Sequence, residues 1–334
     1  MEEPQLNFID TSDGWQLAVY RYPAPAHSRK KYPVLLIHGL STNRYDVDFP
    51  NARLSMAKYL RSQGFDTWMV ELRGTGLSRR RGWYQRIRAR CLSDWTFDDY
   101  IFKDLPTVAR YLRKKTGRKK IHWIGHSLGG TVLYAALGTM PQTGAASAVV
   151  LGAGMSASAR PGFVRLGLKA DPILKWFPFL PLVAMARLGR PLAHWLAGLQ
   201  ENVYYARENL DKKTLQQAMK IAVEDVSVPL FMQLHDWYKN NHFCSLDKKI
   251  SYRDNLKKIR TPFLVGAGSV DGVIPYPDVH FGFRMLGARS KKMVVFGKEQ
   301  GCKTEYGHID LVLGKNAPDE VYPVVADWLT RHDR

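Results

Sequence analysis

Short, almost wholly apolar segments alternate with helical patterns along most of this chain, and this alternation constrains the fold more than any other feature. The apolar segments read YPVLLIHG, FDTWMVELRG, KKIHWIG, ASAVVLGAG, TPFLVGAG and KKMVVFG. Strands that are apolar on both faces are typical of a parallel sheet covered by helices on both sides. The sequence therefore predicts an α/β fold with a mostly parallel sheet and right-handed crossovers. A hairpin, NFIDTSDGWQLAVYRYPA, precedes it.

The alternation breaks between Met155 and Arg260, where about 100 residues are mostly helical and punctuated by prolines. Because strands resume after this segment, we interpret it as an insertion after the sixth strand rather than as a separate terminal domain. The sequence thus predicts a core made of residues 1–154 and 261–334, with a helical cap or lid at residues 155–260 above the strand ends.

Composition and charge limit the kinds of protein that this chain can be. Of its 334 residues, 45% are hydrophobic and 24% are charged, which excludes a disordered or fibrous chain. The formal net charge of +19 indicates attraction to an anionic membrane surface, an acidic polymer or nucleic acid. The three cysteines, Cys91, Cys244 and Cys302, are scattered and form no C-x-x-C pair, so we interpret them as reduced thiols.

No targeting or membrane-spanning segment is expected. The first residues, MEEPQLNFIDTSDG, are acidic and lack the apolar core of a secretory signal, so the expected compartment is the cytoplasm. The longest uncharged apolar run, WFPFLPLVAMA from Trp176, is too short to span a bilayer and contains two prolines.

The segment KKIHWIGHSLGGTVLYAAL, from Lys119 to Leu137, joins a strand pattern to a helix pattern through glycines and one serine. Glycine is costly inside either element, so the junction must need it. One interpretation is a turn in which Ser127 merely caps the helix. The other is a nucleophile elbow, G-H-S-L-G at residues 125–129, whose sharp turn exposes the serine hydroxyl. The strand before it and the apolar helix after it favour the elbow.

A serine nucleophile needs a histidine base oriented by a carboxylate, and candidates for both follow later strands. Asp271 comes shortly after TPFLVGAG, and His308 lies between the last strand and the final helix. In a parallel sheet these positions share one edge with Ser127. The order serine, aspartate, histidine is the one expected for an α/β-hydrolase, so we predict the catalytic triad Ser127, Asp271 and His308.

Other histidines and acids compete with these residues. His122 lies within a buried strand and is interpreted as a core residue, and His126 is expected to point away along the elbow. Asp278 is interpreted as a helix start, and Asp310 as too near His308 in sequence to be its partner. Five further histidines fall in predicted helices or in the insertion, which favours packing or surface roles: His194, His235, His242, His280 and His332.

A tetrahedral intermediate also needs hydrogen-bond donors for its oxyanion. The backbone N–H of Leu128, directly after the nucleophile, is the first predicted donor. The backbone N–H of Leu40, after the strand VLLIHG, is the second. His38 and Gly39 alone would indicate only an ordinary turn at the end of a strand, but beside the elbow they favour an oxyanion hole.

The motifs IHGL, GFDTWMVELRGTGLS, GHSLGG, GSVDGVIP and YGHIDLVLG occur in this order, and through them most of the chain resembles the α/β-hydrolase superfamily. Two longer segments, TFDDYIFKDLPTVARYLRKKTGRKKIHWIGHSLGG and GHIDLVLGKNAPDEVYPVVADWL, are similar to the acid-lipase and polyhydroxyalkanoate-synthase-like branch. The resemblance implies an α/β-hydrolase fold. The chain departs from polyhydroxyalkanoate synthases in having Ser127 where they use cysteine, and from secreted acid lipases in lacking a signal peptide.

Three functions agree with these residues: a serine hydrolase for a small hydrophobic acyl ester, an acyltransferase or related cofactor-free enzyme on the same triad, and an inactive hydrolase fold that serves as a binding module. Serine at position 127 favours acyl transfer over the alkyl chemistry of relatives that use an aspartate nucleophile. The sequence contains no metal-ligand motif and no phosphate-binding loop, so we expect neither a metal nor a cofactor. It does not define an oligomeric state.

Two segments bear on the substrate and the partner. Residues Asp171–Leu199 are rich in large apolar side chains and are interpreted as a packed cap, a lid over an acyl pocket, or a surface that rests on a membrane. The basic segment Ser78–Arg90 is most simply a solvated face. Peripheral contact with an anionic membrane is the stronger alternative, and nucleic acid is the weaker one because no recognition motif is present.

Overall fold

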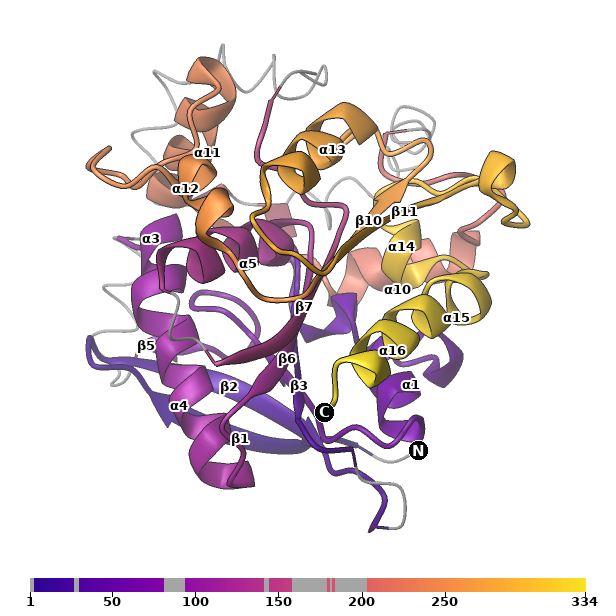
Figure 1. Cartoon of the computed structure of the whole chain (residues 1–334), viewed down its shortest axis with the longest axis horizontal. Coiled ribbons are helices and arrows are strands. Elements are labelled where there is room, and N and C mark those ends of the chain that lie inside the picture. The colour runs from indigo at the N-terminus through magenta and orange to yellow at the C-terminus, as the bar shows by residue number, and fades with distance from the viewer. Residues whose placement is uncertain are drawn as a thin grey trace.

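The computed structural model describes residues 3–26, 30–80, 94–140, 144–157, 179–180, 182–183 and 203–334. Within them, a nine-stranded sheet forms the centre of the molecule and runs in the order β1-β2-β4-β3-β6-β7-β10-β11, with β5 paired to β2 (Figure 1). Its strands are β1 (Gln5–Asp10), β2 (Trp15–Tyr22), β3 (Val34–Ile37), β4 (Thr67–Val70), β5 (Arg79–Arg80), β6 (Ile121–His126), β7 (Ala145–Leu151), β10 (Phe263–Gly268) and β11 (Lys291–Phe296).

All pairings from β4 to β11 along this order are parallel, whereas β2 pairs antiparallel with β1, β4 and β5. The predicted N-terminal hairpin and the mostly parallel sheet are therefore confirmed. Because the strands from β3 to β11 are parallel, their carboxyl ends lie at one edge, where open α/β sheets bind ligands.

Helices cover both faces of the sheet, as predicted (Figure 1). They are α1 (Met56–Ser62), α3 (Phe97–Asp99), α4 (Leu105–Thr116), α5 (Leu128–Thr139), α10 (Lys212–Ile221), α11 (Val228–Asn240), α12 (Tyr252–Asn255), α13 (Tyr276–Met285), α14 (Asp310–Leu313), α15 (Ala317–Glu320) and α16 (Tyr322–Arg331). The helix predicted from Phe97 to Thr116 is found as α3 and α4 joined by one π-helical stretch, Tyr100–Asp104. None of the described helices has the length and apolar character needed to span a bilayer.

The alternation of side chains along each strand produces two hydrophobic cores. Leu35 and Ile37 of β3 pack on the side of α4 and α5, whereas Val34 and Leu36 pack on the side of α1 and α16. All four side chains are fully buried, and complete burial of such a side chain contributes about 1.5–3 kcal/mol to stability. This two-sided burial is why the strands read as continuous apolar runs in the sequence.

The predicted cap is described only in part. Its C-terminal portion contains α10, α11 and α12, and a two-stranded sheet pairs β8 (Phe179–Leu180) with β9 (Val226–Ser227). The last of these helices, α12, packs against the end of α5, where a Cβ added at Gly138 would lie 2.9 Å from the backbone oxygen of Asn255. Residues 158–178, 181 and 184–202 lie outside the described part of the chain, so the cap boundaries stay a prediction.

Candidate active site

Ser127 lies at the turn between β6 and α5 in a conformation that few side chains adopt. Its φ is 53° and its ψ is −121°, which places an L-residue in a strained region of positive φ. The backbone N–H of Ser127 donates to the oxygen of Leu151 on β7 at 2.9 Å, so the neighbouring strand holds this strained residue in place. The backbone therefore has the sharp turn expected of a nucleophile elbow.

Close backbone approach explains the glycines on either side of Ser127. A Cβ added at Gly125 would lie 2.4 Å from the carbonyl carbon of Gly129, and a Cβ added at Gly129 would lie 2.5 Å from the oxygen of Ile37. Gly130 is restricted as well, because its Cβ would lie 2.5 Å from that of Ala153. The start of α5 thus passes too near β3 and β6 to allow any larger residue.

The structure brings the three predicted triad residues together. His308 Nε2 lies 2.8 Å from Ser127 Oγ, and His308 Nδ1 lies 2.8 Å from Asp271 Oδ2. The other carboxylate oxygen of Asp271 accepts hydrogen bonds from the backbone N–H groups of Val273 and Ile274, at 2.9 and 2.8 Å. Asp271 and His308 are buried, at 6% and 4% exposure. This geometry can pass a proton from the serine hydroxyl to a fixed imidazole.

Gly152 follows β7 and lies beside His308 and Asp271. No motif in the sequence marked this glycine as part of the site. Its φ is +57°, and a Cβ at this position would lie 3.2 Å from the His308 ring and 3.3 Å from Asp271 Oδ2. A side chain here would press on both partners of the hydrogen bond. Glycine at the end of this central strand therefore leaves space for the histidine and the aspartate.

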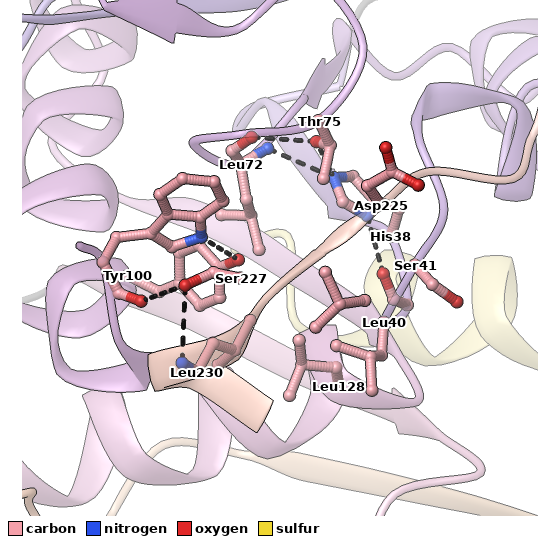
Figure 2. Close-up of a pocket in the computed structure, with 13 residues that line it drawn as sticks. His38, Leu40, Ser41, Leu72, Thr75, Tyr100, Leu128, Asp225, Ser227 and Leu230 are labelled. Carbon is pink, nitrogen blue, oxygen red and sulfur yellow. Dashed lines mark hydrogen bonds between the residues drawn. The ribbon is translucent and has the colours of Figure 1, made fainter. Parts of the chain in front are cut away.

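The two predicted oxyanion donors lie in the wall of one small cavity (Figure 2). Leu128 is the first residue of α5, so its N–H has no acceptor within the helix. No residue in the described part of the chain accepts a hydrogen bond from the N–H of Leu40. Both donors are thus available for a ligand oxygen. Other lining residues are Leu72, Trp95, Tyr100, Asp225, Val226, Ser227 and Leu230.

His38 controls the direction of the Leu40 N–H. Its Nδ1 donates to the oxygen of Gly39 at 2.8 Å, and its Nε2 accepts from the N–H of Leu72 at 3.1 Å (Figure 2). Burial lowers the pKa of His38, which agrees with a neutral ring that has one donor and one acceptor nitrogen. Because C=O and N–H of a trans peptide point in opposite directions, fixing the Gly39 oxygen also fixes the Leu40 N–H.

The loop after β3 is tied to the returning end of the insertion. The oxygen of Ser41 accepts from the N–H of Glu224 at 2.8 Å. Asn43 Nδ2 donates to the oxygen of Ile221 at 2.9 Å and to Glu224 Oε1 at 2.7 Å. The segment that carries Leu40 is therefore held by the cap as well as by the core.

The expectation that His126 points away from the site is wrong. Its Nδ1 lies 2.9 Å from Asp46 Oδ2, and its Nε2 lies 3.2 Å from the backbone oxygen of His308. Both His126 and Asp46 are almost fully buried. Burial lowers the pKa of His126, but the Asp46 carboxylate more than offsets this and raises it overall. Sequence reasoning missed Asp46 entirely, because no motif marks it.

Asp310, the competing acid, lies near the site but has a different role in the structure. Its Oδ2 accepts from the N–H groups of Ala206 and Gly307, both at 2.7 Å, and so fixes the loop that carries His308. Its Oδ1 has no hydrogen-bond partner among the described residues. Burial raises the pKa of Asp310 to about 7 despite the two N–H donors.

An elbow at the end of a central parallel strand, with an acid and a histidine after later strands, defines the class of α/β-hydrolases. A family model described as alpha/beta hydrolase fold matches residues 32–295, and the chain belongs to this family.

Its relatives are acid lipases, in agreement with the resemblance drawn from the motifs. The chain is 27% identical to mouse (Mus musculus) lipase member K over 94% of this chain and 84% of that protein. It is 34% identical to gastric triacylglycerol lipase of Rattus norvegicus over 40% of this chain and 34% of that lipase.

Solved structures of similar fold include several esterases and lipases. Monoglyceride lipase from Saccharomyces cerevisiae superposes with a TM-score of 0.65 at 15% identity, over 99% of this chain and 96% of that one. The esterase from Exiguobacterium antarcticum superposes with a TM-score of 0.63 at 18% identity, over 97% and 99% of the two chains. At this level of identity the likeness shows the fold alone, and the relatives by sequence make the chain an α/β-hydrolase related to lipases.

Proposed function

We propose that this protein is a serine hydrolase that cleaves hydrophobic carboxylic esters through an acyl-enzyme intermediate. The observation that carries the proposal is the position of His308, whose two ring nitrogens lie 2.8 Å from Ser127 Oγ and 2.8 Å from Asp271 Oδ2. The lipase relatives support the same reaction type. A fold kept only as a binding module has no need for the strained Ser127 backbone or for a buried base beside it.

The reaction follows from this arrangement. Ser127 Oγ attacks the acyl carbon while its proton passes to His308 Nε2, and the Asp271 carboxylate stabilises the resulting imidazolium. The N–H groups of Leu40 and Leu128 stabilise the oxyanion. The C–O bond to the alcohol then breaks, and His308 returns its proton to the leaving alkoxide oxygen. Water attacks the acyl-enzyme with His308 as base, which releases the carboxylic acid and regenerates Ser127.

The small cavity beside the two donors has apolar walls, which agrees with a hydrophobic acyl group, and Ser127 itself is not among its lining residues. Leu72, Trp95 and Leu230 contribute buried apolar side chains there. Phe179 of the apolar segment Asp171–Leu199 lies close by, since its ring is 5.7 Å from the Trp95 ring and β8 pairs with the cavity-lining strand β9. Trp176 and Phe177 belong to the segment interpreted from the sequence as a packed cap, a lid over an acyl pocket or a membrane surface, and they lie outside the described residues.

We expect the preference for acyl chain length to follow this apolar wall. Each buried methylene contributes up to about 0.8 kcal/mol, so kcat/KM should rise several-fold per two-carbon step from acetyl to medium-chain esters until the pocket is filled. The measurement is a series of p-nitrophenyl esters from two to twelve carbons at sub-micellar concentration. A profile that peaks at acetyl contradicts the hydrophobic substrate class and leaves only a small ester as substrate.

Fluorophosphonate labelling tests the reaction type directly. Labelled peptide should map to Ser127, and the same preparation should release acid and alcohol from an ester. Supplying glycerol or a long-chain alcohol as acceptor separates hydrolysis from acyl transfer, because a transferase forms a new ester in place of the free acid. Absence of both labelling and turnover would identify an inactive binding module.

For the strong positive charge we propose contact with an anionic membrane, at the amino edge of the sheet. Exposed cations directly precede β3, β6, β10 and β11 at this edge, opposite to Ser127. They are Lys31, Arg118, Lys119, Lys120, Lys257, Lys258, Arg260 and Arg289. Among the described residues, no carboxylate forms an ion pair with any of these side chains. Three basic residues of the Asp171–Leu199 segment, Lys175, Arg187 and Arg190, were also expected to meet lipid headgroups if this segment rests on a membrane, and they lie outside the described residues.

Phosphatidylserine vesicles test this contact. Membrane-adjacent cations contribute about 1 kcal/mol each, so changing Arg118, Lys119 and Lys120 to Glu should weaken vesicle partitioning roughly 100-fold or more. The same change on α10, Lys212→Glu with Lys213→Glu, should have a much smaller effect. Salt should weaken wild-type binding, since exposed charges are screened beyond about 10 Å at 0.1 M ionic strength. Partitioning that resists both salt and the amino-edge changes contradicts the proposal.

A further inference from the structure

One side-chain pair, His126 and Asp46, connects the predicted oxyanion loop, the elbow that carries Ser127 and the loop that carries His308. Asp46 Oδ2 accepts from the backbone N–H of Gly39 at 2.9 Å and lies 2.9 Å from His126 Nδ1. His126 Nε2 in turn lies 3.2 Å from the backbone oxygen of His308. The oxyanion loop, the elbow and the histidine loop therefore meet at His126 and Asp46. Two of the three contacts involve backbone atoms, namely the N–H of Gly39 and the oxygen of His308.

The partners of His126 determine its protonation state. A backbone carbonyl can only accept a hydrogen bond, so Nε2 must carry a proton. Asp46 Oδ2 already accepts from Gly39, which favours the ionised carboxylate at that oxygen, so Nδ1 must also donate. A ring that donates from both nitrogens is an imidazolium. The raised pKa of His126 and the lowered pKa of Asp46, where the charged ring offsets the effect of burial, agree with this ion pair.

The titratable groups around His126 come from four segments. Asp46 lies in the short 3-10 helix Arg44–Asp46, His308 in the loop after β11, Asp271 after β10 and His38 at the end of β3. The His308 ring lies 5.0 Å from the His126 ring, centroid to centroid. His38 is neutral because burial lowers its pKa, so His126 is the cation and Asp46 its counterion.

We propose that the buried ion pair of His126 and Asp46 positions the hydrolase site. It holds the His308 backbone and the oxyanion loop in place relative to Ser127. The inference rests on the proposed function. His126 touches neither the ester nor Ser127 Oγ, and it acts through the His308 carbonyl and, by way of Asp46, through Gly39. Loss of the ring's second proton would remove one of its two donated hydrogen bonds and release one of these segments.

His126→Gln is the decisive variant, because one amide nitrogen can donate to Asp46 or to the His308 oxygen but lacks the charge and span of the imidazolium. We expect kcat/KM to fall about 10- to 100-fold, mainly through kcat, since misplacing a reacting group by about 1 Å can cost a factor of 100. His122→Gln is the matched control. It removes another buried histidine of β6 that lies 3.2 Å from an aspartate, Asp333, at the opposite end of the strand. Its activity should stay within about threefold of wild type at temperatures below its own unfolding transition.

Asp46→Asn provides the second arm. One oxygen of Asp46 serves both the Gly39 N–H and the His126 ring, so an amide group cannot satisfy both as the carboxylate does. The loss should resemble that of His126→Gln, and the double variant should lose little more, because both changes break one coupled unit. Additive losses, or single variants with wild-type kcat and intact folding, would overturn the proposal.

Two further readouts keep the proposal separate from the proposed function. Histidine ¹⁵N NMR of the wild type at pH 6 should show both ring nitrogens of His126 protonated, and a neutral tautomer would overturn the inference. Fluorophosphonate labelling of His126→Gln should be slower by a factor similar to that for kcat, but should reach completion at Ser127. If the wild type itself is neither labelled nor active, the proposed function fails, whereas a labelled and active wild type with an unimpaired His126→Gln variant rejects only the positioning role.

Discussion

Ser127→Ala is expected to lower ester hydrolysis by a factor on the order of 10⁴ or more, because the covalent route through the acyl-enzyme disappears. The change removes a single oxygen atom, the one that lies 2.8 Å from His308 Nε2. It does not relieve the strained backbone, since alanine at φ 53° is about as unfavourable as serine. The thermal unfolding midpoint should therefore stay within a few degrees of wild type, so that loss of activity reports on the chemistry.

A matched control exists in Ser147→Ala. Ser147 is fully buried in β7, where its hydroxyl lies 2.9 Å from His122 Nδ1, remote from the elbow. This change also removes a buried hydroxyl, so it should affect stability but leave kcat/KM within about threefold. Substantial residual turnover by a clean preparation of Ser127→Ala contradicts the serine mechanism and makes a different nucleophile necessary.

The sequence allowed the fold to be predicted because the governing patterns are local. The β3 and β6 strands are apolar on both faces, so the parallel sheet between two helical layers could be predicted from composition and alternation alone. The elbow was predictable for a similar reason, because close approach of the backbone restricts the residues at fixed spacings. A Cβ at Gly125 or Gly129 would clash with neighbouring backbone atoms, so glycine is needed at both positions.

The arrangement around the triad was less predictable because it depends on packing between distant segments. Asp46 precedes His126 by 80 positions, and nothing in the sequence around Asp46 marks it as a partner. Gly152 is constrained only by rings and oxygens that come from later strands. His126 was misjudged on a local argument about the elbow, whereas two acceptors from other segments determine where its ring lies. Motifs indicate backbone shape and candidate chemistry, while the supporting hydrogen bonds emerge only in three dimensions.

The sequence favoured Asp271 over Asp310 as the partner of His308, and the contacts of the two carboxylates support this choice in the proposed mechanism. Asp271 Oδ2 lies 2.8 Å from His308 Nδ1, whereas Asp310 Oδ2 accepts its hydrogen bonds from backbone N–H groups of the loops around it. Since burial raises the pKa of Asp310 to about 7, its carboxyl is partly protonated at neutral pH and a poor partner for an imidazolium. We therefore assign the orienting role to Asp271 in the proposed mechanism.

Asp271→Asn should lower kcat/KM by roughly 10³- to 10⁴-fold at neutral pH, and the local hydrogen bonds show why. The Oδ1 atom of Asp271 accepts from the N–H groups of Val273 and Ile274, so the amide oxygen of asparagine must take this place. The amide nitrogen then faces His308 Nδ1 as a donor. His308 is forced to accept there and to carry its proton on Nε2, where it can no longer take the proton of Ser127.

Asp310→Asn is the matched comparison, measured by the same ester assay and by thermal unfolding. Its amide oxygen can accept from Ala206 and Gly307 as Oδ2 does, and its nitrogen takes the place of Oδ1, which has no hydrogen-bond partner among the described residues. Because this carboxyl already titrates near pH 7, the uncharged amide resembles a state that it occupies at neutral pH, and activity should change by less than about tenfold. A severe loss in Asp310→Asn with an active Asp271→Asn would reverse the assignment of the acid and require His308 to turn toward Asp310 in the working enzyme.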